Sequence, residues 1–203
     1  MTILLQINSG MKGDQSFSSQ LADQLAVRLK SANAPIRHIR HDLCDESLPH
    51  LNNTTFDAFS CSEETLTEEQ KALLAPSDRY IDELRHADIL ILGVPMYNFM
   101  IPSTLKCWID HVTRAGKSFQ FTDTGPVGLL EDRQCYICIA RGGFSSDGAT
   151  DLMKNYLRMI LNFLGIKNIE FLEIEGLAQA KDTPDLLIKN SLKTAGISIL
   201  EGA

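Results

Sequence analysis

The sequence between residues 88 and 94 reads DILILGV and stays apolar from Ile89 onward. A strand that turns one face to water alternates apolar and polar residues. An unbroken apolar run is therefore typical of a central parallel strand that is covered on both faces. The segment CYICIA, residues 135–140, has the same character, and TILLQI, residues 2–7, is a shorter apolar run. Three central strands of a parallel sheet are predicted.

Two further strands carry charges and are expected at the sheet edges: IRHIRH, residues 36–41, and IEFLEIEG, residues 169–176. Apolar residues at helical spacing predict helices between the strands, at 16–30, 67–86, 105–112, 151–164 and 184–200. A long polar stretch spans 42–65. This alternation predicts a doubly wound α/β fold with helices on both faces of a five-stranded parallel sheet. The edge positions fit the flavodoxin-like order 2-1-3-4-5. A single domain over residues 1–203 is expected.

The composition is that of a soluble globular protein, with 44% apolar and 22% charged residues. A net charge of −7 argues against a nucleic-acid partner, which requires clustered Lys and Arg. The N-terminal segment has no basic region, and its apolar run is too short for a signal peptide or a membrane span. We therefore expect a cytoplasmic protein with no membrane partner, and no metal site.

Cys135 and Cys138 have the CxxC spacing of some redox sites. Residues three apart in a strand point to opposite faces, whereas a redox CxxC opens a helix. The five cysteines are therefore expected to be reduced, mostly buried thiols.

The ligand of such a sheet binds beyond the carboxyl ends of the strands, at the switch point between the first and third strands. Three loops meet there, at residues 8–18, 95–102 and 141–148. The first loop clusters the hydroxyls of Ser9, Ser16, Ser18 and Ser19 before a helix, whose unpaired N–H groups favour a phosphate. One serine alone could be only an N-cap, but several hydroxyls favour a phosphate monoester.

The other two loops supply surfaces for a flat ring. Met96, Tyr97 and Phe99 offer apolar area beside the amide of Asn98, although packing under the next helix is the alternative. The pair Gly142-Gly143 lets backbone N–H groups approach a ligand closely. A phosphate site, an apolar wall and backbone donors at one crevice fit a phosphorylated planar cofactor, for which FMN is the candidate.

Other phosphate motifs do not match. No GxGxxG follows the first strand, so a Rossmann dinucleotide site is not expected. The segment AGKS, residues 115–118, lacks the first glycine of a P-loop and follows a helix rather than a strand.

Several segments resemble the FMN-dependent NADH-azoreductases, which are flavodoxin-like homodimers that also reduce quinones. They are PMYNF at 95–99, ARGG at 140–143, the serine loop from Ser9 to Ser18, and RAGKSFQFTDTGPVGL at 114–129. The resemblance runs over essentially the whole chain, and PMYNF is its most specific part.

The resemblance implies FMN contacts residue by residue. It assigns the ribityl phosphate end to Ser9, Ser16, Phe17 and Ser18, and the isoalloxazine ring and its pyrimidine edge to Pro95, Met96, Tyr97, Asn98, Phe99, Ala140, Arg141, Gly142 and Gly143. It also implies that Phe119 and Phe163 line the substrate pocket of their own or the partner subunit, with ordinary packing as the alternative. Ala140 stands where the family often has serine, and NFMIPS, residues 98–103, replaces a more polar loop.

The implied reaction is flavin-borne. NADH or NADPH passes a hydride to the flavin, and a quinone or azo compound then takes its place, which is ping-pong behaviour. The N–H groups of Gly142 and Gly143 would stabilise negative charge on the reduced flavin. No catalytic side chain is expected, and the five histidines are expected at the surface or at caps, away from the crevice.

Three alternatives remain at this stage. A flavodoxin-type electron carrier would bind FMN tightly, hold a stable one-electron reduced state and not oxidise NADH. A receiver-like module would need an acidic pair after the first strand, where Asn8 and Ser9 stand. Quinones could be the physiological acceptors and azo dyes incidental. The apolar residues on more than one face of the helix at 151–164 favour a homodimer.

Overall fold

The computed structural model describes residues 1–32, 35–46, 48–144 and 151–194. Its main sheet has five parallel strands in the order β2-β1-β3-β6-β7, so the predicted order is confirmed. The strands are β1 (Thr2–Asn8), β2 (Ile36–Asp42), β3 (Ile89–Pro95), β6 (Gln134–Ala140) and β7 (Ile169–Ile174). The charged strands β2 and β7 lie at the edges, as predicted.

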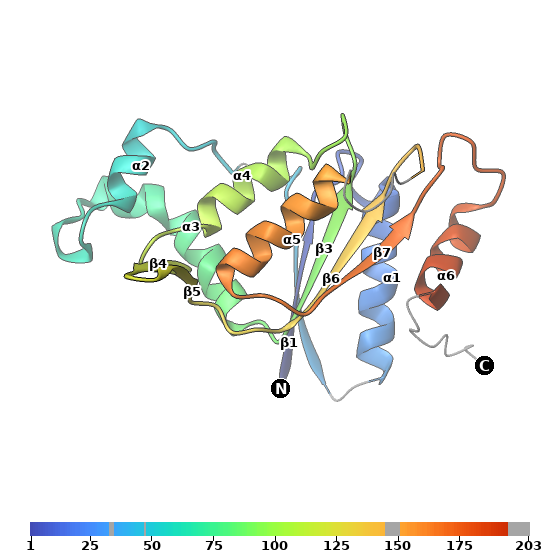
Figure 1. Cartoon of the computed structure of the whole chain (residues 1–203), viewed down its shortest axis with the longest axis horizontal. Helices are drawn as coiled ribbons and strands as arrows, with labels where there is room; N and C mark the ends of the chain where they lie inside the picture. Colours follow the sequence, from blue (N-terminus) through green and yellow to red (C-terminus); the bar gives the residue numbers. More distant parts are fainter. Residues whose placement is uncertain (33–34, 47, 145–150, 195–203) are drawn as a thin grey trace.

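Helices cover both faces of the sheet (Figure 1). They are α1 (Phe17–Ala32), α3 (Glu68–His86), α4 (Ser103–Val112), α5 (Leu152–Leu164) and α6 (Pro184–Thr194). Helices α1 and α6 lie on one face, and α3, α4 and α5 lie on the other. The predicted continuation of the last helix to residue 200 lies outside the described residues.

Consecutive residues of the central strands enter different cores. Ile91 of β3 packs with α1 and α6, whereas Leu90 and Leu92 pack with α3, α4 and α5. All three are at most 1% exposed. The unbroken apolar run therefore reflects a strand with no solvent face, which is the reason that its sequence lacks alternation.

The CxxC pair behaves as the strand geometry requires. Cys135 belongs to the core on one face of β6, Cys138 belongs to the core on the other face, and both are fully buried. All five cysteines are free thiols, and the position of this pair on opposite faces of a strand favours core packing over a redox site.

Local signals explain some helix ends. Thr67 accepts a hydrogen bond from the backbone N–H of Gln70, and the Gln70 side chain accepts one from the N–H of Thr67, which completes the predicted capping box of α3. The polar stretch at 42–65 contains α2 (Asn53–Phe59), capped by Asn52, and the short 3₁₀ turn η2 (Glu63–Thr65). Neither element was predicted.

An antiparallel hairpin was also missed. β4 (Phe119–Thr122) pairs with β5 (Gly125–Gly128) in a separate two-stranded sheet. Strands of four residues are too short to show a clear period in the sequence. In the described residues no helix is long and apolar enough to span a membrane, and no cluster of side chains suits a metal ion.

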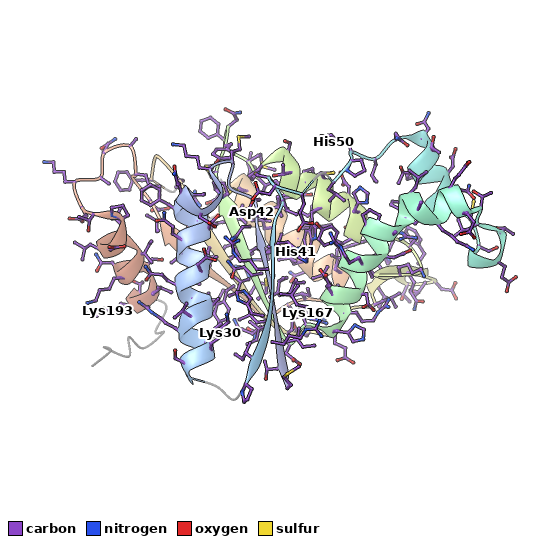
Figure 2. The ribbon with its side chains drawn as sticks, turned by 180° about the vertical axis from the view of Figure 1, so that it is seen from behind. Lys30, His41, Asp42, His50, Lys167 and Lys193 are labelled. Carbon is purple, nitrogen blue, oxygen red and sulfur yellow. The ribbon has the colours of Figure 1, made fainter. Side chains whose placement is uncertain are left out.

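The prediction that all histidines lie at the surface or at caps is wrong for two of them. His111 is fully buried and bonds to the carbonyl oxygen of Pro49 through Nε2 at 2.8 Å. His41, near the loop end of β2 (Figure 2), is 8% exposed and lies between two carboxylates. Its ring nitrogens contact Glu46 at 2.5 Å and Glu83 at 2.7 Å, and such long-range pairing leaves no periodic trace in the sequence.

We expect the His41 cluster to make stability depend on pH. The bond to Glu83, together with that to Glu46, raises the pKa of His41 above 6.5. A raised folded pKa stabilises the protonated, folded form, so this stabilisation is complete below pH 6.5 and is lost as pH rises through the folded pKa.

Urea unfolding at a series of pH values should show the free energy of unfolding falling in that window. The variant His41→Gln should lose this slope, and His86→Gln, at an exposed histidine of α3, should keep it. An equal slope in all three proteins would contradict the assignment.

Candidate functional site

The structure joins the first, second and third loops at the carboxyl ends of β1, β3 and β6. The backbone N–H and the side-chain hydroxyl of Ser9 both donate to the carbonyl oxygen of Gly93, at 3.0 and 2.9 Å. The N–H of Met11 donates to the Tyr97 hydroxyl at 3.3 Å. The N–H of Met96 donates to the carbonyl oxygen of Ala140 at 2.9 Å. The three loops that the strand order predicts to meet are therefore adjacent.

The first loop delivers buried hydroxyls to the N-terminus of α1. The short 3₁₀ turn η1 (Gly13–Gln15) leads into this helix. Ser16, Ser18 and Ser19 are 6%, 0% and 0% exposed, and the hydroxyls of Ser16 and Ser18 lie 3.1 Å apart. The Ser19 hydroxyl is buried with no partner among the described residues. Since the first N–H groups of a helix lack intrahelical acceptors, this end is rich in donors.

Gly10 allows this arrangement. A Cβ atom at Gly10 would lie 2.2 Å from Ser16 Oγ and 2.4 Å from Ser16 Cβ. Only glycine fits at this position, and its lack of a side chain lets Ser16 pack directly against the loop.

The second loop is a two-residue turn. Tyr97 and Met100 exchange both backbone hydrogen bonds at 3.0 Å, and between them Asn98 and Phe99 have φ of 51° and 66°. This is the type I′ geometry, for which asparagine is suited and phenylalanine is not. Phe99 is 82% exposed despite that cost. A large ring held outward on a strained backbone is typical of a functional surface.

The strain at Phe99 gives a stability test. We expect Phe99→Gly to unfold with a free energy about 1 kcal/mol above that of Phe99→Ala, because only glycine adopts this φ without a steric cost. Urea unfolding of both proteins without cofactor measures the difference. Phe121, 75% exposed on β4, is the matched position with ordinary strand backbone, where the alanine variant should be the more stable one. If the alanine variant were the more stable one at residue 99 as well as at residue 121, the backbone of Phe99 would not be strained.

The third loop offers backbone donors. A Cβ at Gly143 would meet no atom within 4 Å, and one at Gly142 would meet only the Ala178 methyl group at 3.7 Å. The N–H groups of Gly142 and Gly143 have no hydrogen-bond partner among the described residues. The part of this loop at 145–150 lies outside those residues.

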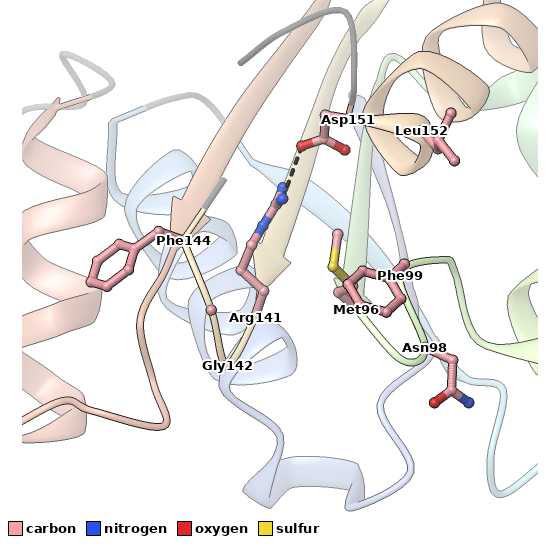
Figure 3. Close-up of a pocket in the computed structure, with 9 residues that line it drawn as sticks. Met96, Asn98, Phe99, Arg141, Gly142, Phe144, Asp151 and Leu152 are labelled. Carbon is pink, nitrogen blue, oxygen red and sulfur yellow. Dashed lines mark hydrogen bonds and ion pairs between the residues drawn. The ribbon is translucent and has the colours of Figure 1, made fainter. Parts of the chain in front are cut away.

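The Arg141 side chain is held within the protein. Its guanidinium binds Asp151 at 2.9 Å and Glu173 at 2.9 Å, and lies 3.6 Å from Glu175. The side chains of Arg141 and Asp151 are 4% and 2% exposed. Figure 3 shows the guanidinium directed at Asp151, on the wall of a pocket. The side chain therefore fixes the start of α5 against the third loop.

That pocket has a volume of about 550 Å³. Six residues that the sequence predicts to contact the cofactor line it: Met96, Asn98, Phe99, Arg141, Gly142 and Gly143. Phe144, Asp151 and Leu152 also line it and were not predicted (Figure 3). The position of Phe144 directly after the glycine pair was the available signal for it.

Other predicted residues lie around the pocket rather than on it. Pro95 and Ala140 are buried at the ends of neighbouring strands, where they face each other in the register of β3 and β6. Phe17 is half-buried at the start of α1, and the hydroxyl of Tyr97 is engaged by Met11. The rings of Phe119, in β4, and Phe163 contact each other in a tilted arrangement with centres 4.7 Å apart, and they line no part of this pocket.

Asp42, at the end of β2, and Cys44, just after it, lie close to the first loop. Asp42 is 8% exposed, and its burial raises the pKa of its carboxyl group. Burial likewise raises the pKa of the Cys44 thiol, which donates to the carbonyl oxygen of Ser9 at 3.7 Å. Cys44 is therefore a protonated packing contact of the loop and is not an activated nucleophile.

Comparison with known proteins agrees with this geometry. A family model described as a flavodoxin-like fold matches residues 1–194. An FMN-dependent NADH:quinone oxidoreductase of Cellvibrio japonicus is 46% identical over 177 residues, which cover 87% of this chain and 89% of that protein. A protein of the same name from Psychromonas ingrahamii is 40% identical over 197 residues, covering 97% and 94%.

Among solved structures, an azoreductase from Bacillus anthracis str. Sterne matches with a TM-score of 0.84 at 30% identity, covering 96% of this chain and 97% of that one. An FMN-dependent NADH-azoreductase from Bacillus anthracis str. Ames Ancestor, in complex with FMN, matches with a TM-score of 0.85 at 26% identity over both full chains. The fold, the switch-point loops and these relatives agree: the chain belongs to the flavodoxin-like family of FMN-dependent NADH:quinone oxidoreductases and azoreductases.

Proposed function

We propose that the protein is an FMN-dependent NADH oxidoreductase that reduces quinones and reductively cleaves azo compounds, and that residues 1–203 form one FMN-binding domain. The observation that carries the proposal is that the serine-rich first loop is hydrogen-bonded to the second loop, which together with the third loop lines a pocket of about 550 Å³. A volume of this size suits a cofactor ring system. The relatives named above bear the same activity in their names.

The donor set fits the phosphate of FMN. A phosphate at the α1 N-terminus would accept from backbone N–H groups and from the hydroxyls of Ser16 and Ser18. The buried Ser19 hydroxyl has no protein partner among the described residues, which is costly unless a ligand or water accepts its proton. We therefore assign the phosphate end to Ser9, Ser16, Phe17 and Ser18, with Ser9 acting by anchoring the loop to Gly93.

The pocket fits the flavin ring. Met96 and Phe99 provide apolar walls, and the N–H groups of Gly142 and Gly143 are open to an acceptor because no side chain blocks them. The loops are supported by residues that do not line the pocket: Tyr97, Pro95 and Ala140. Arg141 acts through its ion pair with Asp151, which holds the third loop in place.

Bound FMN supplies the chemistry of hydride uptake and delivery. The chain would supply orientation and charge stabilisation, because the N–H groups of Gly142 and Gly143 could donate to the flavin as it gains negative charge on reduction. The ionisable side chains that line the pocket, Arg141 and Asp151, bind each other at 2.9 Å. We accordingly assign no general acid to the protein. NADH and the acceptor would use one open face in turn.

We further propose a homodimer. Leu152 and Met159 of α5 are 65% and 62% exposed, and Phe121 of the hairpin is 75% exposed. Such apolar area on neighbouring elements favours a partner. The Phe119–Phe163 stack would then border a substrate site in its own or the partner subunit. Sedimentation velocity of the purified protein measures the assembly. The five free thiols suit the cytoplasm, where we propose that the enzyme works.

The test is an anaerobic visible spectrum of protein reconstituted with FMN and desalted. We expect retained flavin whose absorbance bleaches on addition of NADH and returns on addition of a quinone or an azo dye. Parallel additions of NADPH establish the donor preference. Flavin that is retained but ignores both nucleotides would favour an electron carrier of flavodoxin type. Loss of all flavin on desalting would overturn the proposed function.

A further inference from the structure

Arg40 of β2 binds the first loop and α1 at once. Its Nη2 contacts Asp14 Oδ1 at 2.6 Å, and its Nε contacts Asp23 Oδ1 at 3.1 Å. Asp14 belongs to η1, two residues before Ser16, and Asp23 lies about 1.7 turns into α1. A single guanidinium on an edge strand thus joins the turn before the proposed phosphate site to the helix behind it.

The inner side of this contact is anchored in the sheet. Asp23 Oδ1 also accepts from the amide of Gln6 at 2.6 Å, and Gln6 is fully buried in the central strand β1, paired in register with Arg40. The same amide donates to Asn8 Oδ1 at 3.1 Å. A buried polar residue in a central strand is unusual, and here it holds Asp23 in place for Arg40.

The contact matters because carboxylates surround the loop that would hold a dianion. Asp14 is 84% exposed at its side chain, and Asp42 Oδ2 lies 3.9 Å from the position of a Cβ at Gly13. The Cα atoms of residues 14 and 16 are at most about 7.6 Å apart, which is within the Debye length of about 8 Å at physiological salt. An uncompensated Asp14 would therefore repel the phosphate.

We propose that Arg40 is a positioning residue for the FMN phosphate, acting by neutralising Asp14 and by turning its carboxylate toward β2. The proposal rests on the proposed function of the site. It predicts a specific energetic role: Arg40 removes a repulsion and makes no contact with the cofactor itself.

The test is titration of the cofactor-free protein with FMN and with riboflavin, followed by quenching of flavin fluorescence at low and high salt. We expect Arg40→Gln to weaken FMN binding roughly 5-fold to 10-fold at low salt and by less than about twofold at high salt, because the lost term is screened Coulomb energy. Riboflavin has no phosphate, so its affinity should not change.

Two further variants separate charge from mechanical support. Asp14→Asn breaks the ion pair but removes the repelling charge, so it should bind FMN at least as tightly as the unchanged protein. The double variant Arg40→Gln with Asp14→Asn should recover to within about twofold of the unchanged protein. Arg37→Gln is the matched control: it removes an equal charge from the same strand, about 10 Å further along, at an exposed residue with no ion pair among the described residues.

The outcomes are distinguishable. Weak FMN binding by Asp14→Asn and by the double variant would make Arg40 a mechanical clasp and overturn the charge argument. Equal FMN affinity of Arg40→Gln and the unchanged protein would overturn the inference while leaving the FMN site intact. Failure of the unchanged protein to bind FMN at all would overturn the proposed function and this inference with it.

Discussion

Replacing Gly10 with alanine is expected to lower the affinity for FMN by on the order of 100-fold, which corresponds to about 3 kcal/mol of lost binding energy. The added Cβ would lie 2.2 Å from Ser16 Oγ and 2.4 Å from Ser16 Cβ. Rotation of the Ser16 side chain moves Oγ but leaves Ser16 Cβ in contact with the added methyl group. The backbone of the turn must therefore move. The hydroxyls of Ser16 and Ser18 would then no longer lie 3.1 Å apart, in position to bind one phosphate together. Fluorescence titration of the cofactor-free protein with FMN measures the effect.

A second substitution tests the steric cause. Gly10→Ala combined with Ser16→Gly removes the atoms that collide, so the loop should return to its place without the Ser16 hydroxyl. We expect the double variant to bind FMN more tightly than Gly10→Ala alone and less tightly than the unchanged protein. Circular dichroism checks that all three proteins are folded. Full affinity in Gly10→Ala would mean that the serine cluster does not hold the phosphate.

Replacing Arg141 with methionine is expected to lower the free energy of unfolding by about 3–5 kcal/mol. The guanidinium binds Asp151 at 2.9 Å where both side chains are almost fully buried, and it also contacts Glu173 at 2.9 Å. Methionine fills similar volume but leaves the Asp151 carboxylate without its cationic partner in a poorly solvated place. Urea unfolding at neutral pH measures the change.

The charge origin of this loss is tested by Arg141→Met with Asp151→Asn. Removing the buried negative charge as well should restore a large part of the stability, because the penalty arises from a buried carboxylate that has lost the Arg141 guanidinium. Arg37→Met, at an exposed arginine, should change stability by no more than about 0.5 kcal/mol. A double variant no more stable than Arg141→Met would show that packing, and not charge, is what Arg141 contributes.

The sequence by itself determined the sheet and indicated where the candidate site lies. A strand covered on both faces carries mostly apolar residues, so Leu90, Ile91 and Leu92 indicate a central strand before the rest of the fold is known. Charged strands could only lie at the edges. Once the order was fixed, the rule that ligands bind at the switch point selected the three loops. The glycine pair and the serines could then be assigned from their composition.

Only the tertiary structure decided which charges meet and which backbones are strained. Arg40 and Asp14 are 26 residues apart, and Arg141 reaches Glu173 across 32 residues. A sequence period reports whether a residue faces a core, but it does not report its partner on another element. The left-handed φ of Phe99 follows from the bonds between Tyr97 and Met100, against the preference of phenylalanine itself. His41 can be buried because Glu46 and Glu83 pair with both of its ring nitrogens. The strands β4 and β5 have only four residues each, which is too few to show a period in the sequence.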